Sequence, residues 1–375
     1  MFDQITALAN DAEQMFQLAA KQLAEAGQFH QLFDLRLMQR RHELEVPLDR
    51  ETVLDDLEPG LRIQLEESYL GACREVGQLL LEAGQAREAW TYLQPACEKP
   101  LLQNWLAQVV PTEESADELI ELALHQGVDP ERGFAWLLAR RGTCNSITEL
   151  ESMCGSLPIK DQVACATVLV RHLHEELLSN VQGHLERLEK EAPESASLSE
   201  LLVDNPEVMA DGAYHVDTSH LATTVRFSRL LTEPALVKLS IELADYGSRL
   251  TKDLQYPDSA PFEDTYPAHL MLLRATLGED AEQAIEYFAG RAGEVEMDEY
   301  GTSAVETYLI LLKRVGKADM AIDEYARLVP KNYSLSPYAP TLLQLARTSG
   351  RWDRYLEVCQ ERADVVGFAV GHLSK

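Results

Sequence analysis

Apolar residues recur three and four positions apart along most of this chain, as in Leu119, Leu122 and Ala123. That spacing places them on one face of an α-helix, whereas a half-buried strand alternates at every second residue. Strand-like alternation and clusters of β-branched residues are scarce, and good helix formers such as Leu, Ala, Glu, Gln and Arg fill most segments. The pattern therefore predicts an all-α protein.

Short breaks containing Gly, Pro or Asp divide the expected helices, and helices joined by short loops pack as antiparallel neighbours. Two segments are richer in proline. Residues 191–214 carry two prolines and residues 255–267 carry three, and prolines stop helices. We expect both to be long surface loops on either side of a central helical unit at residues 215–254.

A pattern of small and apolar residues around a glycine repeats along the chain. A glycine at a tight turn lets the second helix of a pair pack back against the first through a small residue. The matching positions are Gly77, Leu80, Gly84, Ala89, Leu93 and Ala96; Leu309, Leu312, Gly316, Ala321, Tyr325 and Leu328; Leu272, Ala275, Ala284 and Phe288, with Gly278 one place early; Leu343, Ala346, Gly350, Tyr355 and Cys359; and, more loosely, Ala20, Leu23, Gly27 and Leu32.

These residues resemble the tetratricopeptide repeat, over about residues 69–100 and 268–365 and more loosely 8–40, or roughly half of the chain. Arg291 and Arg362 depart from the pattern, because a small apolar residue is usual there. The resemblance implies a right-handed solenoid of helical hairpins whose concave surface holds a peptide or a partner protein. The expected organisation is repeat-like hairpins at 1–110, a non-repeat central unit at 111–267 and further repeats at 268–375.

Charge narrows the classes of partner. The chain has 375 residues and a formal net charge of −29, from 62 acidic and 33 basic side chains. Nucleic acids and anionic membrane surfaces attract basic faces, so we expect neither as a partner. A basic or neutral protein or peptide fits the charge better.

The first residues of the chain and the spacing of its cysteines both bear on the cellular compartment. No Lys or Arg precedes Lys21, and no apolar run reaches the roughly 20 residues of a membrane span. The six cysteines form no CxxC pair, so neither a zinc ribbon nor a disulfide framework is indicated. A cytoplasmic protein is expected.

The densest group of metal-ligand residue types is His215, Asp217 and His220. Imidazole and carboxylate suit a divalent transition metal, which would be the cofactor of such a site. Asp217 or Ser219 is also a good N-cap for a helix over residues 221–231. A metal site and a plain helix start both remain open at this level.

A predicted helix over residues 163–188 supplies a second group. Its apolar stripe contains Asn180 and His184, with Glu176 at the stripe's edge. These three side chains either line a polar pocket facing His215 and His220 or form a hydrogen-bonded pair that fixes the packing of the helix.

Two weaker candidates complete the set. Gly142 is expected to end one helix and Ser146 to cap the next, which places Cys144 beside arginines at a helix start, where a thiolate is favoured. A plain connection between helices is the alternative. Arg226, with Arg229 and Arg171, could form an anion pocket in an otherwise acidic protein.

Two functions follow. One is a soluble helical-repeat scaffold that binds a protein or peptide. The other is a metal-dependent enzyme or small-ligand binder with a His/Asp site in the central unit. No GxGxxG, GxxxxGK, HExxH or GxSxG motif is present, which disfavours dinucleotide, P-loop, zincin and α/β-hydrolase sites.

Overall fold

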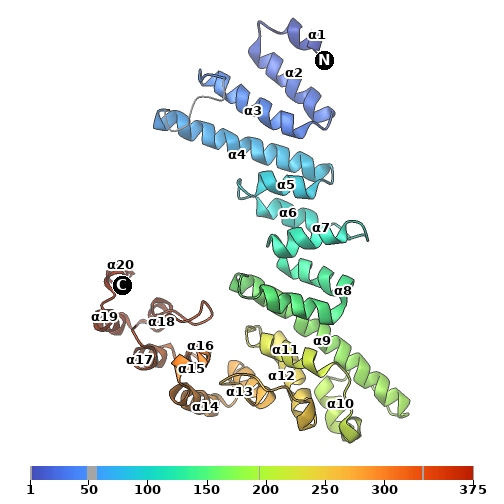
Figure 1. The fold of residues 1–375 in the computed structure, drawn as a ribbon, viewed down its shortest axis with the longest axis vertical. Helices are drawn as coiled ribbons and strands as arrows, with labels where there is room; N and C mark the ends of the chain where they lie inside the picture. The colour runs from blue at the N-terminus through green and yellow to red at the C-terminus, as the bar shows by residue number, and fades with distance from the viewer. Residues whose placement is uncertain (1, 49–56, 194, 332, 375) are drawn as a thin grey trace. The chain divides into compact units, whose positions relative to one another are not determined.

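A computed structural model describes residues 2–48, 57–193, 195–331 and 333–374. Every regular element within these ranges is a helix, and the ranges contain no strand, which confirms the all-α prediction (Figure 1). None of the described helices is long and apolar enough to span a lipid bilayer.

The chain divides into two compact units, Met1–Arg140 and Arg141–Lys375. The division falls inside helix α8, next to Gly142, whose φ of 74° and ψ of 170° interrupt the helix. The boundaries expected near residues 110 and 267 do not mark this division. Leu106 and Leu119, on either side of residue 110, share one core, and helices α12 and α13 pack together across residues 250–264.

The first unit is a series of helices that pack on their neighbours in the chain. Contacts join α2 to α3, α3 to α4 and α4 to α5, and Figure 1 shows these four side by side. Their core includes Val76, Leu80 and Leu93. The elements are α1 (Phe2–Ala7), α2 (Ala12–Glu25), α3 (Phe29–Glu43), α4 (Pro59–Glu82), α5 (Ala86–Leu93), α6 (Lys99–Leu106), α7 (Ala116–Ile120), the π-helical η2 (Glu121–His125) and the first part of α8 (Pro130–Met153).

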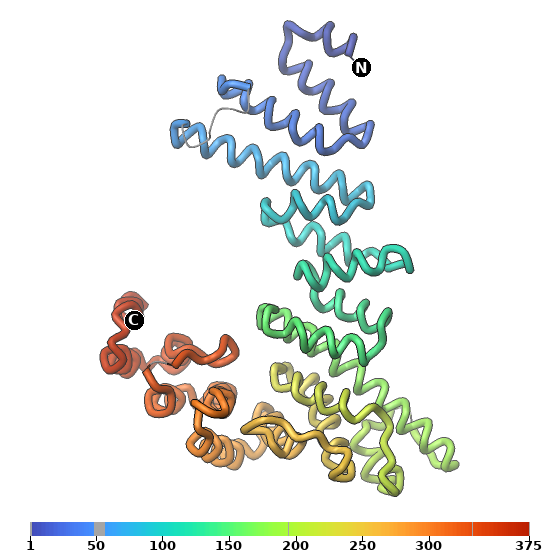
Figure 2. The backbone as a smooth tube through the Cα atoms, in the orientation of Figure 1, coloured from blue at the N-terminus to red at the C-terminus, as the bar shows by residue number. Residues whose placement is uncertain are grey.

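The second unit holds the remaining helices around two apolar clusters. One cluster lies among α9, α10, α11 and α12, and the other runs from α13 to α19; Figure 2 follows the backbone through both. The elements are α9 (Ile159–Arg187), α10 (Leu198–Asp204), η3 (Pro206–Gly212), α11 (Thr218–Ser228), α12 (Pro234–Arg249), η4 (Lys252–Leu254), α13 (Thr265–Thr276), α14 (Ala281–Glu294), α15 (Met297–Tyr300), α16 (Ser303–Arg314), α17 (Ala318–Leu328), α18 (Leu342–Ser349), α19 (Trp352–Glu361) and α20 (Val365–Ser374).

The repeated glycines lie at the turns of helical hairpins. Gly84 joins α4 to α5 with a φ of 76°, and Gly316 joins α16 to α17 with a φ of 78°. Both values lie in the left-handed region, where a side chain is disfavoured. Ala89 and Ala321, five residues later, are fully buried. The structural role predicted for these four residues is confirmed.

The predicted loop at residues 191–214 is wrong in part, because α10 and η3 lie within it. Ser197 and Glu200 form a capping box at the start of α10. Leu198, Leu202 and Val208 are fully buried in the core of the unit, and this burial stabilises short helices that prolines would otherwise discourage. The second predicted loop, at residues 255–267, is non-helical over 255–264, whereas its last three residues belong to α13, which begins at Thr265.

Candidate ligand-binding pocket

The structure brings part of the predicted His cluster together. Nδ1 of His184, on α9, lies 2.8 Å from Nε2 of His215, and Asn180 donates its amide N–H to the backbone oxygen of His215 at 2.8 Å. Sequence analysis proposed that these residues meet, and they do. The third contact was not foreseen: Nδ1 of His215 is 2.8 Å from the hydroxyl of Tyr246, on α12.

One arrangement of protons gives every contact along these three rings both a donor and an acceptor. The backbone N–H of His215 also donates to the Tyr246 hydroxyl, so that hydroxyl is free to donate its own proton to Nδ1 of His215. The proton of His215 then sits on Nε2 and is donated to His184. Burial, together with the nearby His184 and Arg187, lowers the pKa of His215 to about 4.

Asp217 and His220 take another role. The Asp217 carboxylate accepts hydrogen bonds from the backbone N–H groups of Ser219 and His220 and from the Ser219 hydroxyl, which makes it the N-cap of α11. These bonds hold the pKa of Asp217 below its usual value. Among the described residues no group of three or more His, Cys, Asp or Glu side chains could hold a metal ion. The proposed ligand set His215, Asp217 and His220 is therefore not assembled, because Asp217 caps the helix and both ring nitrogens of His215 are engaged.

The predicted stripe on α9 also needs correction. The buried face continues through Leu177, Val181 and Leu185, whereas Leu188 is 44% exposed. Asn180 is accordingly exposed beside the stripe rather than inside it. Glu176 lies 3.7 Å from His172 on its own helix and belongs to the surface. In this part of α9 a buried polar contact is made instead by His174, whose Nε2 is 2.6 Å from a carboxylate oxygen of Glu242 on α12.

Cys144 is exposed on α8. Ser146 does not cap a new helix there. It is fully buried and donates its hydroxyl to the backbone oxygen of Gly142. The helix resumes directly after Gly142, so Cys144 lies in its first turn on the surface.

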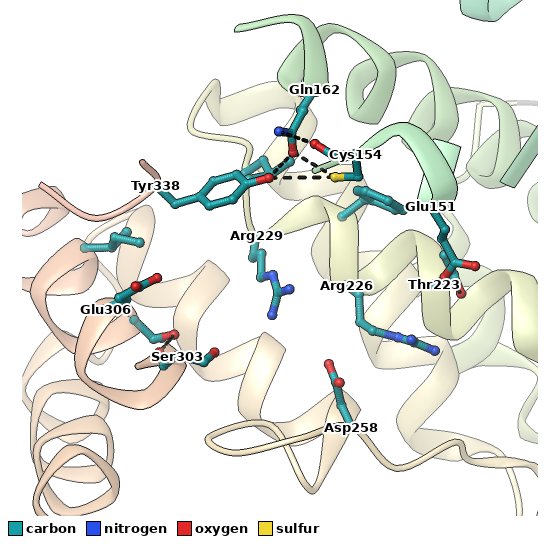
Figure 3. Close-up of a pocket in the computed structure, with 14 residues that line it drawn as sticks. Glu151, Cys154, Gln162, Thr223, Arg226, Arg229, Asp258, Ser303, Glu306 and Tyr338 are labelled. Atoms are coloured by element: carbon teal, nitrogen blue, oxygen red, sulfur yellow. Dashed lines mark hydrogen bonds between the residues drawn. The ribbon is translucent and has the colours of Figure 1, made fainter. Parts of the chain in front are cut away.

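Arg226 lines a pocket within the second unit, apart from the histidines, that sequence analysis did not delineate (Figure 3). Its volume is about 380 Å³, within the range of small-molecule sites. The polar residues come from the end of α8, the start of α9, α11, the 255–264 segment, α16 and the loop before α18. They are Glu151, Cys154, Gln162, Thr223, Arg226, Arg229, Asp258, Ser303, Glu306, Thr307 and Tyr338.

One wall of the pocket is a closed hydrogen-bond network (Figure 3). The Gln162 amide donates to the backbone oxygens of Cys154 and Leu157, and its oxygen accepts from the Cys154 thiol at 2.8 Å and from the Tyr338 hydroxyl. Every polar atom of the Gln162 side chain therefore has a partner. Through this network Tyr338, in the loop before α18, is hydrogen-bonded to the start of α9.

Glu306 holds the same loop from α16. Its carboxylate accepts the Ser336 backbone N–H at 2.6 Å, the Ser336 hydroxyl at 2.5 Å and the Thr302 hydroxyl at 2.7 Å. Glu306 is 8% exposed. Its hydrogen-bonding capacity is used by the fold, so it shapes the pocket rather than offering a ligand contact.

The two arginines of the pocket have hydrogen-bonding capacity that the described part of the fold does not use. Arg226 and Arg229 stand one helical turn apart at the end of α11. Nε of Arg226 is buried, and no described residue accepts a hydrogen bond from it. Arg229 lies over the ring of Phe262, with its guanidinium carbon 5.6 Å from the ring centre. A third guanidinium is close, since Arg314 donates to the backbone oxygen of Arg229 at 2.6 Å. Burial lowers the pKa of Arg314 to about 10.

Sequence analysis missed most of this pocket. Arg226 and Arg229 were recognised as a candidate anion pair, but Asp258, Gln162 and Tyr338 were not. The available signal was the proline-rich 255–267 segment, since long loops are often functional. Arg171, the third proposed arginine, does not line the pocket.

Comparison with known proteins finds no family model that matches the chain, no matching curated protein and no matching solved structure.

Proposed function

We propose that this chain is a helical-repeat binding protein whose second unit receives the anionic group of a ligand in the pocket lined by Arg226 and Arg229. The observation that carries the proposal is the buried Nε of Arg226, which has no acceptor within the described part of the chain. The protein around it has a formal charge of −29, so carboxylates are abundant, yet none of those in the described ranges accepts a hydrogen bond from Nε of this side chain.

An unpaired buried donor destabilises a fold by about 1–3 kcal/mol, and more when the group is charged. A bound carboxylate or phosphate relieves that penalty, because the guanidinium presents paired N–H donors that match two anionic oxygens. Arg229, one turn away, adds a second positive charge on the same side of the pocket.

The repeat-like hairpins favour a second candidate function. The resemblance to tetratricopeptide repeats supports a solenoid scaffold that holds a protein or peptide, and in that case the anionic group belongs to the partner's side chain or C-terminus. The His/Asp metal enzyme considered from sequence loses its support, because Asp217 serves as a helix cap.

Labelling arginine with ¹⁵N allows a direct test. N-acetylglycine and inorganic phosphate serve as probes, and the Nε–H signals are followed during titration. We expect the Arg226 signal to move and saturate. Arg226→Gln should abolish binding, and Arg347→Gln, at an exposed site on α18 in the same unit, should leave it intact.

The proposal fails if neither anion moves the Arg226 signal, or if the two variants bind equally well. A long peptide that binds while both small anions fail would move the assignment to the scaffold function.

A further inference from the structure

The pocket contains an unused acceptor as well as an unused donor. Oδ2 of Asp258 is buried and receives no hydrogen bond from any described residue. The same pocket contains the buried, unpartnered Nε of Arg226. The two side chains carry opposite charges, and no hydrogen bond joins them among the contacts of the described residues.

The backbone fixes the direction of the Asp258 carboxylate. Its other oxygen, Oδ1, accepts the backbone N–H of Ser259 at 2.8 Å. In Figure 3 the carboxylate points from the 255–264 segment toward the space between Arg226 and Arg229. Oδ2 is thus held toward the pocket by a local turn, rather than drawn toward either arginine.

A buried histidine packs beside this part of the pocket, because Arg229 lies over the ring of Phe262 and Phe262 stacks on His269. His269, on α13, is fully buried and stacks on Phe262 with ring centres 4.2 Å apart. Its pKa is lowered to about 4 chiefly by burial; Arg229 and Arg226 lower it further, and Asp258 acts in the opposite direction. Arg226, Arg229 and Asp258 all line the same pocket, and we treat them as a single charged cluster.

A simple anion would satisfy only half of this cluster. It would pair with the arginines, but it would leave Asp258 unpaired and would be repelled by that carboxylate and by Glu151 at the pocket edge. A simple cation would pair with Asp258, but it would leave the arginines unpaired and would be repelled by them. A ligand with both charges satisfies each buried group, and buried polar groups are generally satisfied in a functioning site.

We propose that the pocket binds a zwitterion of the amino-acid class, either a free amino acid or a dipeptide. Its carboxylate pairs with Arg226 and Arg229, and its ammonium group donates to Asp258. The inference rests on the proposed anion-binding function. The volume of about 380 Å³ accommodates a ligand of this size, and Phe227, Leu230 and Ile310 supply apolar surface for a side chain.

The test compares ligands that differ in one charge. The twenty free amino acids and the dipeptide Gly-Leu are titrated by calorimetry. Each ligand that binds is then compared with its N-acetyl form, which lacks the ammonium group, and with its C-terminal amide, which lacks the carboxylate. We expect the zwitterion to bind at least about tenfold more tightly than either blocked form, because each removes a charge-assisted hydrogen bond.

Variants of the protein test which residue binds the ammonium group of the ligand and which binds its carboxylate. Asp258→Asn should weaken zwitterion binding about tenfold but should not weaken binding of the N-acetyl form, because that anion loses a repelling carboxylate. Arg226→Gln should weaken both. Asp253→Asn, an exposed position in η4, is the matched control for Asp258. The comparison of blocked ligands uses the unaltered protein, so it stands even if a variant folds poorly.

Each result bears on a different claim. An N-acetyl form that binds as tightly as its parent zwitterion, and depends on Arg226, overturns the zwitterion inference and keeps the anion-binding function. Binding of the zwitterion that is insensitive to Asp258→Asn also overturns the inference. Absence of binding by all the amino acids, the dipeptide and their N-acetyl forms overturns both claims.

Discussion

The hydroxyl oxygen of Tyr246 lies 2.8 Å from both the backbone nitrogen and the ring Nδ1 of His215. The Tyr246 hydroxyl thereby accepts a hydrogen bond from the backbone N–H of His215 and can donate one to the His215 imidazole. Burial raises the pKa of Tyr246 to about 12, so the hydroxyl keeps its proton. The contact holds the start of α11 to α12 through a side chain that is fully buried.

Tyr246→Phe tests this contact. We expect it to destabilise the protein by about 1–3 kcal/mol, because the His215 backbone N–H and Nδ1 lose their partner. The pKa of His215 should rise from about 4, since Nδ1 becomes free to take a proton. Chemical denaturation and histidine NMR titration give the two values. A matched Tyr214→Phe change, at a 60% exposed position, should alter neither.

Gly247→Ala should destabilise the second unit by about 1–3 kcal/mol, since a Cβ at this position would overlap the ring of Tyr266. Gly290→Ala on α14 is the control. A Cβ at Gly290 has no neighbour within 4 Å, so the same change there should stabilise the helix by about 0.5–1 kcal/mol. Thermal unfolding compares the two variants, and equal effects would contradict the packing described for Tyr266.

Stability should fall as the pH drops below about 6.5. His269 is held neutral in the folded protein with a pKa of about 4, whereas in the unfolded chain it takes up a proton near pH 6.5. Because the unfolded state binds more protons between these values, unfolding becomes easier across that window, by about 3 kcal/mol for this residue. His215 acts in the same direction.

His269→Asn should flatten this dependence, as measured by urea unfolding at pH 7 and pH 4.5. His372→Asn, at an exposed site on α20, should preserve the slope of the unaltered protein. An unchanged slope in His269→Asn would show that the buried imidazole does not titrate in this way.

Glu306→Ala should loosen the loop that carries Tyr338. The change leaves the Ser336 N–H and hydroxyl without their acceptor, at a cost of about 1–3 kcal/mol. Hydrogen exchange at the Ser336 amide should accelerate. Glu299→Ala, at an exposed site on α15, should leave exchange at Ser336 as it is. If Ser336 remains protected in Glu306→Ala, another contact holds the loop.

Much of the fold could be predicted from local sequence patterns. The spacing of Leu309, Leu312, Gly316 and Ala321 predicted a hairpin, and α16, a left-handed turn and α17 are found there. Such features depend on residues within one or two helical turns of each other. The short helices α10 and η3 were missed because their stability comes from burying Leu198 and Val208 against other helices.

Only part of the candidate site could be predicted from the sequence. Proximity in sequence suggested a joint role for His215, Asp217 and His220, but the cap requirement of α11 uses Asp217. The contact between His184 and His215 was anticipated because both belong to one central segment. The pocket itself joins residues as distant as Gln162 and Tyr338, and no local spacing encodes such a pair.

The sequence by itself determined the helical class, the hairpin turns and the acidic net charge, because each follows from periodicity, backbone preference or composition. The tertiary structure alone decided which polar groups are left without partners. The sequence offered Arg226 as one member of a possible anion pocket and did not single out Asp258. The two become opposed ligand contacts only because packing buries Nε of one and Oδ2 of the other in the same pocket without joining them, and burial is a property of the assembled fold rather than of any segment.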